Sequence, residues 1–209
     1  MKSIKFLTLL FFGLFPIVAI AQDDNVRGIV RTERGYLVVW NQPKNNFSLH
    51  AIGKVFEKIP NENIAFLVDG NFLQITAAFK KDFLTSDQKK QGLEEPDILL
   101  AHRDWESNYL GQVLKEKLKI DSEPIKLSTN KDALLWSFLV PENSKGEVKK
   151  QIFLTVVNDE SAIVLNGAVT SKFTEAMVRQ FLLTVAITVK PSKNALSRED
   201  AVKLASKYD

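Results

Sequence analysis

His102 and Glu106 are the two side chains in this sequence best suited to chemistry, because they stand four residues apart in a segment with helical spacing. Residues four apart share one helix face, so an imidazole and a carboxylate there could exchange a proton or hold a metal together. Two ligands do not complete a metal site, and the only other histidine, His50, is distant in sequence. We therefore expect no metal and no cofactor, with His102 at the edge of a buried helical stripe and Glu106 in solvent.

The chain lacks the short motifs of several enzyme classes. It contains no cysteine, no Gly-x-Ser-x-Gly nucleophile elbow and no glycine-rich phosphate loop; Gly28, for instance, is isolated. Thiol catalysis and cysteine-bound metals are therefore excluded, and nucleotide binding has no support. A hydrolase or lyase that uses His102 or His50 as a general base remains an alternative. It predicts that one histidine shares a pocket with a carboxylate.

Three tryptophans supply large amphipathic side chains of the kind that line binding clefts. Trp40 and Trp105 are the candidate ligand-binding residues, and Trp136 is the third. Each stands in an apolar segment that needs core residues, so we expect all three to be buried.

The first 21 residues have the pattern of a signal peptide. Lys2 and Lys5 precede an apolar run of about 15 residues, shorter than the roughly 20 that span a bilayer, and Ala19-Ile20-Ala21 forms a cleavage site. We expect residues 1–21 to be removed and residues 22–209 to form one domain without a membrane span. Its destination is then a bacterial periplasm or the outside of the cell.

Charge gives no sign of a polyanionic partner. Cleavage removes two of the 28 basic residues, which leaves them nearly balanced by 25 acidic ones, and the basic pairs lie beside acidic residues. We therefore expect no binding of nucleic acid.

The elements that position these side chains follow from the spacing of apolar residues. Hairpins are predicted at 26–40 and at 64–79, the latter turning at Asp69-Gly70-Asn71, and a further strand at 47–56. Helical spacing, in one helix or two, covers 86–120, and strands follow at 125–127, 133–140, 151–157 and 162–170. A helix over 174–187 should bury Met177, Val178, Phe181, Leu182 and Val185, and Ser197 should cap a closing helix.

This order predicts an α+β fold: a mainly antiparallel sheet with a mid-chain helix and C-terminal helices packed on it, like an α/β/α sandwich. Two local features stand apart from it. Asn166-Gly167 interrupts a strand pattern and predicts a bulge or turn, with a close ligand approach as the alternative. Asn46-Phe47-Ser48 is an N-glycosylation sequon, which matters only in a eukaryotic secretory pathway.

The order of elements resembles the PsbP-like superfamily. The similarity rests on the N-terminal hairpin that ends in Trp40, the strand at 47–49, the mid-chain helix, the paired strands at 152–170 and the helix from Thr174. It implies an α/β/α sandwich and a non-catalytic binding or assembly role, and it assigns no site residue.

We accordingly expect an exported, non-enzymatic binding or assembly protein, whose partner is an unknown protein or small ligand. An oligomeric envelope component is a further alternative, which an exposed apolar sheet edge or patch would support.

Overall fold

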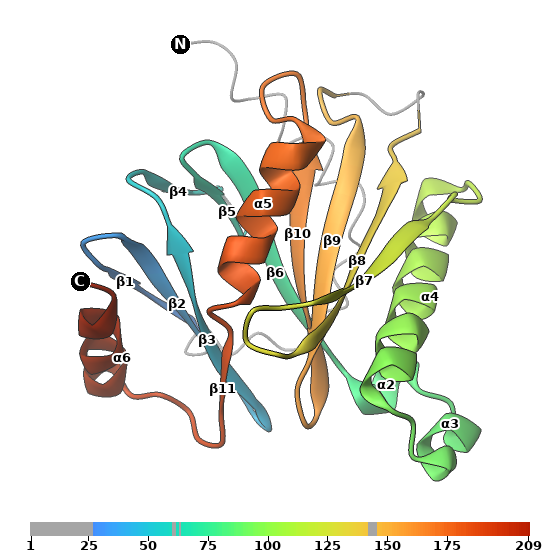
Figure 1. Cartoon of the computed structure of the whole chain (residues 1–209), viewed down its shortest axis with the longest axis horizontal. Helices are drawn as coiled ribbons and strands as arrows, with labels where there is room; N and C mark the ends of the chain where they lie inside the picture. The colour runs from blue at the N-terminus through green and yellow to red at the C-terminus, as the bar shows by residue number, and fades with distance from the viewer. Residues whose placement is uncertain (1–26, 60–61, 63, 142–145) are drawn as a thin grey trace.

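The computed structural model describes residues 27–59, 62, 64–141 and 146–209, and the expected signal peptide lies outside them. The described residues form two antiparallel sheets flanked by helices (Figure 1). The small sheet has the order β1 (Arg27–Arg31), β2 (Gly35–Gln42), β3 (Asn45–Ile52), β11 (Lys190–Ser192). The large sheet has the order β4 (Phe56–Lys58), β5 (Ala65–Val68), β6 (Asn71–Phe79), β10 (Ser161–Val169), β9 (Lys150–Val157), β8 (Asp132–Leu139), β7 (Asp121–Lys126).

Helices cover both faces of the large sheet and one face of the small sheet. The described helices are α2 (Lys80–Phe83), α3 (Ser86–Gln91), α4 (Glu95–Leu114), α5 (Glu175–Ala186), α6 (Arg198–Ala205) and the closing 3-10 turn η3 (Ser206–Tyr208). Among the described residues, none of the helices combines the length and the apolar composition that a bilayer crossing requires.

Both predicted hairpins are present. Strands β1 and β2 pair from Arg27↔Trp40 to Arg31↔Tyr36, and β5 pairs with β6. The second turn has positive φ at both central residues, 48° at Asp69 and 79° at Gly70, as a tight two-residue turn requires.

The segment with helical spacing forms two helices. Helix α3 ends at Gly92, whose φ of 63° is left-handed, and α4 then begins at Glu95 with Pro96 in its first turn. Helix α4 ends at Leu114 with Lys115 as its C-cap, so residues 115–120, which we expected to continue the helix, do not.

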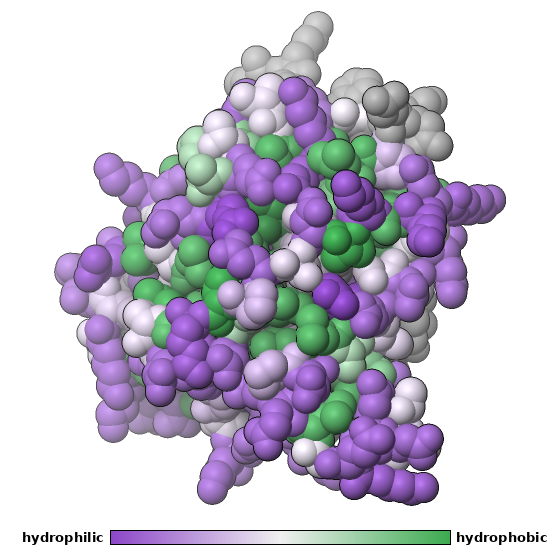
Figure 2. Space-filling model, turned by 45° about the vertical axis from the view of Figure 1, so that its right-hand side comes forward, coloured by the Kyte–Doolittle hydropathy of each residue, from purple (hydrophilic) through white to green (hydrophobic). Residues whose placement is uncertain are grey.

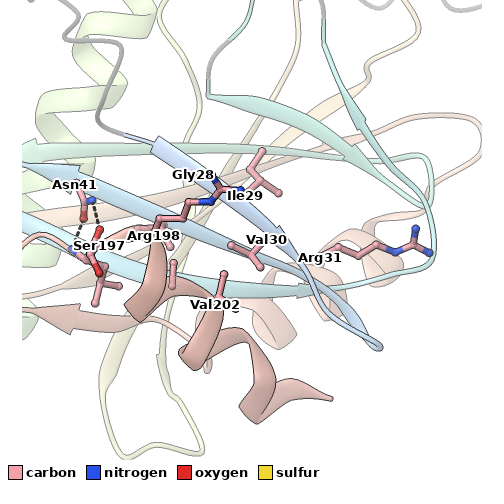
Figure 3. A pocket seen from close by; sticks show the side chains of 11 residues that line it. Gly28, Ile29, Val30, Arg31, Asn41, Ser197, Arg198 and Val202 are labelled. Atoms are coloured by element: carbon pink, nitrogen blue, oxygen red, sulfur yellow. Dashed lines mark hydrogen bonds between the residues drawn. The ribbon is translucent and has the colours of Figure 1, made fainter.

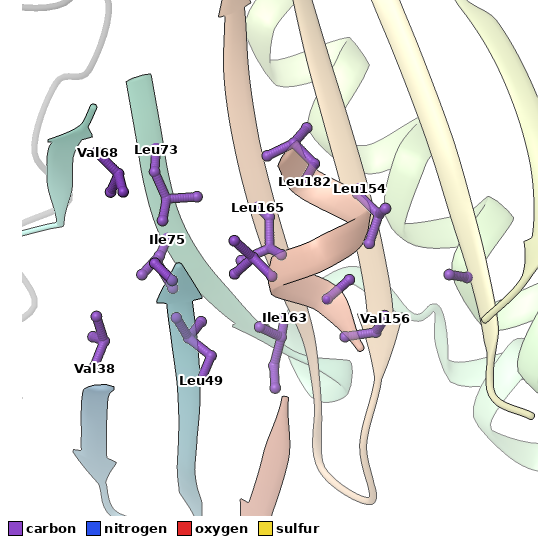
Figure 4. Packing of buried hydrophobic residues seen from close by; sticks show 14 of the residues in the cluster. Val38, Leu49, Val68, Leu73, Ile75, Leu154, Val156, Ile163, Leu165 and Leu182 are labelled. Carbon is purple, nitrogen blue, oxygen red and sulfur yellow. The ribbon is translucent and has the colours of Figure 1, made fainter. Parts of the chain in front are cut away.

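Strand alternation divides the core of the large sheet into two faces. On β10, Ile163 and Leu165 point towards α5 and the small sheet, whereas Ala162 and Val164 point towards α4. Figure 4 shows side chains from both sheets and from α5 meeting in the first of these regions. Two apolar faces on one sheet require cover on both sides, which α5 with the small sheet, and α4, provide.

The α+β class is confirmed, and the structure adds one detail: the strands divide between two sheets. The small sheet is also apolar on both faces. Val38 and Trp40 of β2 face the main core, while Leu37 and Val39 face α6. Strand β11 was not predicted, because it has three residues and contains Pro191, which leaves no recognisable strand pattern.

Two burial predictions are wrong. Met177 is 48% exposed, because α5 packs through Val178, Leu182 and Val185, and Met177 lies on the outward side. Trp105 is 41% exposed, because α4 turns a different set of residues, among them Leu99, towards the sheet.

The predicted bulge or turn at Asn166-Gly167 is also wrong. Both residues continue the regular ladder of β10, opposite Phe153 and Ile152 of β9. Glycine is needed here because α5 packs closely: a Cβ on Gly167 would lie 2.6 Å from Val178 Cγ1.

Replacing Gly167 with alanine should therefore destabilise the protein by about 1–3 kcal/mol, since α5 has to move outward. Urea denaturation would measure the change in the free energy of unfolding. The matched control is Gly28→Ala, whose Cβ would meet Val39 only at 4.0 Å. Equal stability of the two variants would contradict the close packing of α5.

Candidate functional site

The structure brings His102 and Glu106 together on the inner side of α4. His102 Nε2 lies 3.5 Å from Glu106 Oε2, and the two side chains are 1% and 14% exposed. Although part of the glutamate reaches the surface, its Oε2 is fully enclosed. The expectation that Glu106 lies in solvent is thus wrong, because one helical turn places it beside the buried His102.

Aromatic rings surround this pair. Phe83 of α2 lies edge-on to the His102 ring, with centroids 5.1 Å apart, and the Trp105 ring lies 6.0 Å from it. Within the described part of the chain, His102 Nδ1 has no hydrogen-bond partner, and neither does Glu106 Oε2. The pair is therefore held mainly by apolar packing.

Burial sets the protonation states of the pair. Desolvation lowers the pKa of His102 to about 4 and raises the pKa of Glu106 to about 8. At neutral pH the imidazole is therefore uncharged and the carboxyl group keeps its proton. An uncharged pair is the form that an apolar environment tolerates best.

The pair is poorly placed to act on a solute. A general base must come within hydrogen-bond reach of its substrate, and His102 is closed off by Phe83 and by the packing of α4 on the large sheet. The described residues also hold no group of three or more potential metal ligands. Helix α2 or α4 would have to move before the pair could do chemistry.

His50 lies elsewhere, in β3 of the small sheet, and is 2% exposed. Its Nε2 lies 2.9 Å from Thr32 Oγ1, and its ring stacks on Tyr208 with centroids 4.2 Å apart. Burial, and then the charge of Arg34, lower the pKa of His50, against an opposing effect of Asp209. These contacts attach the C-terminal turn to the small sheet.

The tryptophans divide as follows. Trp40 is buried and stacks on Phe47, and Trp136 is buried and donates to Thr155 Oγ1 at 3.1 Å, so both are core residues as expected. Trp105 is the candidate that reaches the surface. The sequon residue Asn46 is 8% exposed and lies in β3 between β2 and β11, so a glycan could not be added to the folded chain.

A groove that the sequence did not predict lies between β1 and α6 (Figure 3). It encloses about 490 Å³. Gly28 creates part of this space, because the absence of a side chain leaves the strand surface beside Val39 open. Its walls are made by Gly28, Ile29, Val30, Arg31, Val39, Asn41, Leu196, Ser197, Arg198, Ala201 and Val202.

Both sides of the groove are held firmly. The Asn41 side chain donates to the Leu196 carbonyl at 2.9 Å and accepts from its N–H at 3.0 Å. Ser197 caps α6 in a capping box with Asp200, as the sequence predicted. Gly28 and the Ser197 cap can each be recognised in the sequence, but nothing in the sequence pattern places these two distant segments side by side.

The pair on α4 should make stability depend on pH. The raised pKa of Glu106 removes stability as pH rises from 4.5 to about 8, and the lowered pKa of His102 removes it as pH falls from 6.5 to about 4. The two effects oppose each other below pH 6.5. Above pH 6.5 only Glu106 acts, so stability falls towards pH 8.

Glu106→Gln should remove this decline, because the amide has no proton to lose. We expect the variant to gain about 1–2 kcal/mol over the unmodified protein between pH 6.5 and 8, measured by urea denaturation at a series of pH values. Glu116→Gln, at an exposed residue just after α4, is the control and should leave the decline in place. If the free energy of unfolding of Glu106→Gln still falls between pH 6.5 and 8 as in the unmodified protein, the Glu106 carboxyl group is not the cause of the decline.

Similarity to known proteins is found in structure and not in sequence. No protein-family model matches the chain, and no curated protein matches it. Among solved structures, the chain is similar to cyanobacterial PsbP (CyanoP) from Synechocystis sp. PCC 6803, with a TM-score of 0.48 and 10% identity, over 75% of this chain and 92% of that chain. That neighbour is a PsbP protein, the family that the order of elements resembles, and the similarity concerns the fold alone.

Proposed function

We propose that this protein is an exported, non-catalytic binding protein whose binding site is the groove between β1 and α6. The observation that carries the proposal is the contrast between this open groove and the two histidines, which are 2% and 1% exposed at His50 and His102. Export rests on the signal-peptide pattern of residues 1–21.

The chemistry of the groove favours binding over catalysis. Its walls carry two arginines, Asn41 and Ser197, and no histidine, aspartate or glutamate. Asn41 is engaged by Leu196, and the Ser197 hydroxyl donates to Asp200 Oδ2 at 2.7 Å. The hydrogen bonds from Ser197 lower the pKa of Asp200, so this carboxylate is a weak base for activating the hydroxyl, and the groove is better suited to recognise a ligand than to attack one.

A second candidate function is that of an oligomeric component, which the surface of α5 favours. Met177 is 48% exposed, and Ile187, just past the end of the helix, is 40% exposed. Figure 2 shows hydrophobic side chains reaching one face of the molecule in groups among hydrophilic ones. Binding of a second copy through the exposed side of α5 would be independent of the groove.

Site-specific crosslinking distinguishes these two functions. Because the sequence contains no cysteine, each introduced thiol is the single site of labelling. Val202→Cys places a thiol in the groove, where the native residue is 53% exposed, and Met177→Cys places one on α5, where it is 48% exposed. Each variant, produced in its own organism, would be labelled with a photoactivatable crosslinker. We expect a discrete adduct from Val202→Cys and none from Met177→Cys.

The adduct must also depend on the shape of the groove. Gly28→Phe in the Val202→Cys background should abolish it, because the new ring occupies the space beside Val39. Capture of a second copy by Met177→Cys would support the oligomeric function instead. An adduct that survives Gly28→Phe would place binding outside the groove.

A further inference from the structure

Strand β1 forms an open edge of the small sheet. In the part of the chain that the structure describes, β2 is the only strand paired with it. The hairpin closes with the Thr32 N–H donating to the Gly35 carbonyl at 2.9 Å. Because pairing alternates along an antiparallel ladder, the backbone groups of Arg31 and Ile29 point away from β2. Within the described ranges these N–H and C=O groups have no strand partner, so they can pair with a further strand.

The other described edges offer less. Strand β7 contains Pro124, which lacks an N–H, and charged residues at both ends, features that protect an edge against pairing. Strands β4 and β11 have three residues each. Strand β1, with five residues and no proline, is the described edge best suited to accept another strand.

The groove lies on the outer side of this edge. Beside Gly28 the strand surface is open, and Val30, Val39 and Val202 make an apolar wall. A strand that pairs with β1 turns every second side chain to this side, where it could pack against α6. The groove therefore supplies side-chain contacts, and the edge supplies backbone hydrogen bonds.

Charge indicates which segment fits. Arg198 extends from α6 across to Gly28 and Ile29, and Arg31 extends outward at the far end of β1 (Figure 3). Among the described residues neither guanidinium has an ion-pair partner, and no acidic residue lines the groove. Glu199 and Asp200 already occupy the first turn of α6, so the attraction for an anion rests on the two arginines and not on the helix dipole.

The same charges disfavour a second copy of this chain at the edge. Strand β1 contains no acidic residue that could pair with Arg31 or Arg198. A second copy pairing here would bring its own Arg31 to an edge that already carries two cations, and like charges across a strand pair are destabilising.

From the edge, the groove and the charges, we propose that the ligand of this site is an extended acidic segment of another protein. The segment pairs with β1 as a fifth strand of the small sheet, and its carboxylates bind Arg31 and Arg198. This inference rests on the binding role proposed for the groove.

An array of synthetic heptapeptides tests the inference directly. The five interior residues of each peptide are valine, threonine and isoleucine, in an order that varies across the array. The two end residues are both glutamate, both lysine or both glutamine, which defines three classes of peptide. With the full mature chain, we expect glutamate-ended peptides to bind at least about tenfold tighter than lysine-ended ones. Equal affinity of the three classes would overturn the acidic preference.

Two double variants examine the role of the arginines. Arg31→Glu with Arg198→Glu should reverse the preference, so that lysine-ended peptides bind more tightly. The matched control is Lys117→Glu with Lys119→Glu, which makes the same charge change at two exposed residues after α4 and should leave the preference unchanged. If the control variant also loses the preference for glutamate-ended peptides, the net charge of the protein causes that preference, and its assignment to Arg31 and Arg198 is contradicted.

Hydrogen exchange examines the strand pairing itself. Binding of a glutamate-ended peptide should slow exchange of the Ile29 and Arg31 amides, while the Val30 amide, which faces β2, stays as it was. Arg31→Pro, which lacks the N–H, should weaken binding more than Arg31→Gln, which lacks only the charge. Unprotected amides, or equal binding to inorganic polyphosphate, would overturn strand addition.

These results separate the inference from the proposed function. If lysine-ended or glutamine-ended peptides bind equally well and Gly28→Phe blocks them, the groove is a binding site without acidic preference, and the inference alone fails. If no peptide binds while Val202→Cys still captures its adduct, the ligand is not an extended acidic segment. If no peptide binds and Val202→Cys also captures no adduct, the proposed function is overturned as well.

Discussion

The close packing of α5 on β10 is the contact on which the rest of the structure depends. Gly167 allows Val178 to approach the sheet, and Leu182 then fills the region where the two sheets meet. From α5 the chain continues directly to β11 and joins the small sheet. The contact therefore sets the position of the small sheet, and with it the place where α6 can pack.

The groove follows from that arrangement. The small sheet has a second apolar face, and α6 covers it through Ala201 and Ala205 packed on Leu37 and Val39. This cover stops short of complete closure beside Gly28, where the strand has no side chain. The apolar hollow beside β1 results from an incomplete match between one short helix and one sheet face.

The histidine–carboxylate pair shows that residues suited to chemistry also serve in packing. His102 is enclosed among Phe83, Trp105 and the apolar face of α4, and Glu106 is forced towards its uncharged form. Both groups keep their proton-transfer chemistry, but His102 is 1% exposed, so a substrate could reach its ring only after α2 or α4 moved. What remains is a coupling of fold stability to pH, because burial penalises charge.

Local sequence determined the hairpins, the helices α4 and α5, the Ser197 cap of α6 and the α+β class, since these depend on apolar spacing and on residues such as Gly70 and Ser197. The spacing of His102 and Glu106 correctly placed them on one helix face. The exposure of Trp105 and Met177, the need for glycine at position 167 and the place where Gly28 meets Arg198 were decided only by tertiary structure. Periodicity along one segment carries no information about the surface that another segment, distant in sequence, presents to it.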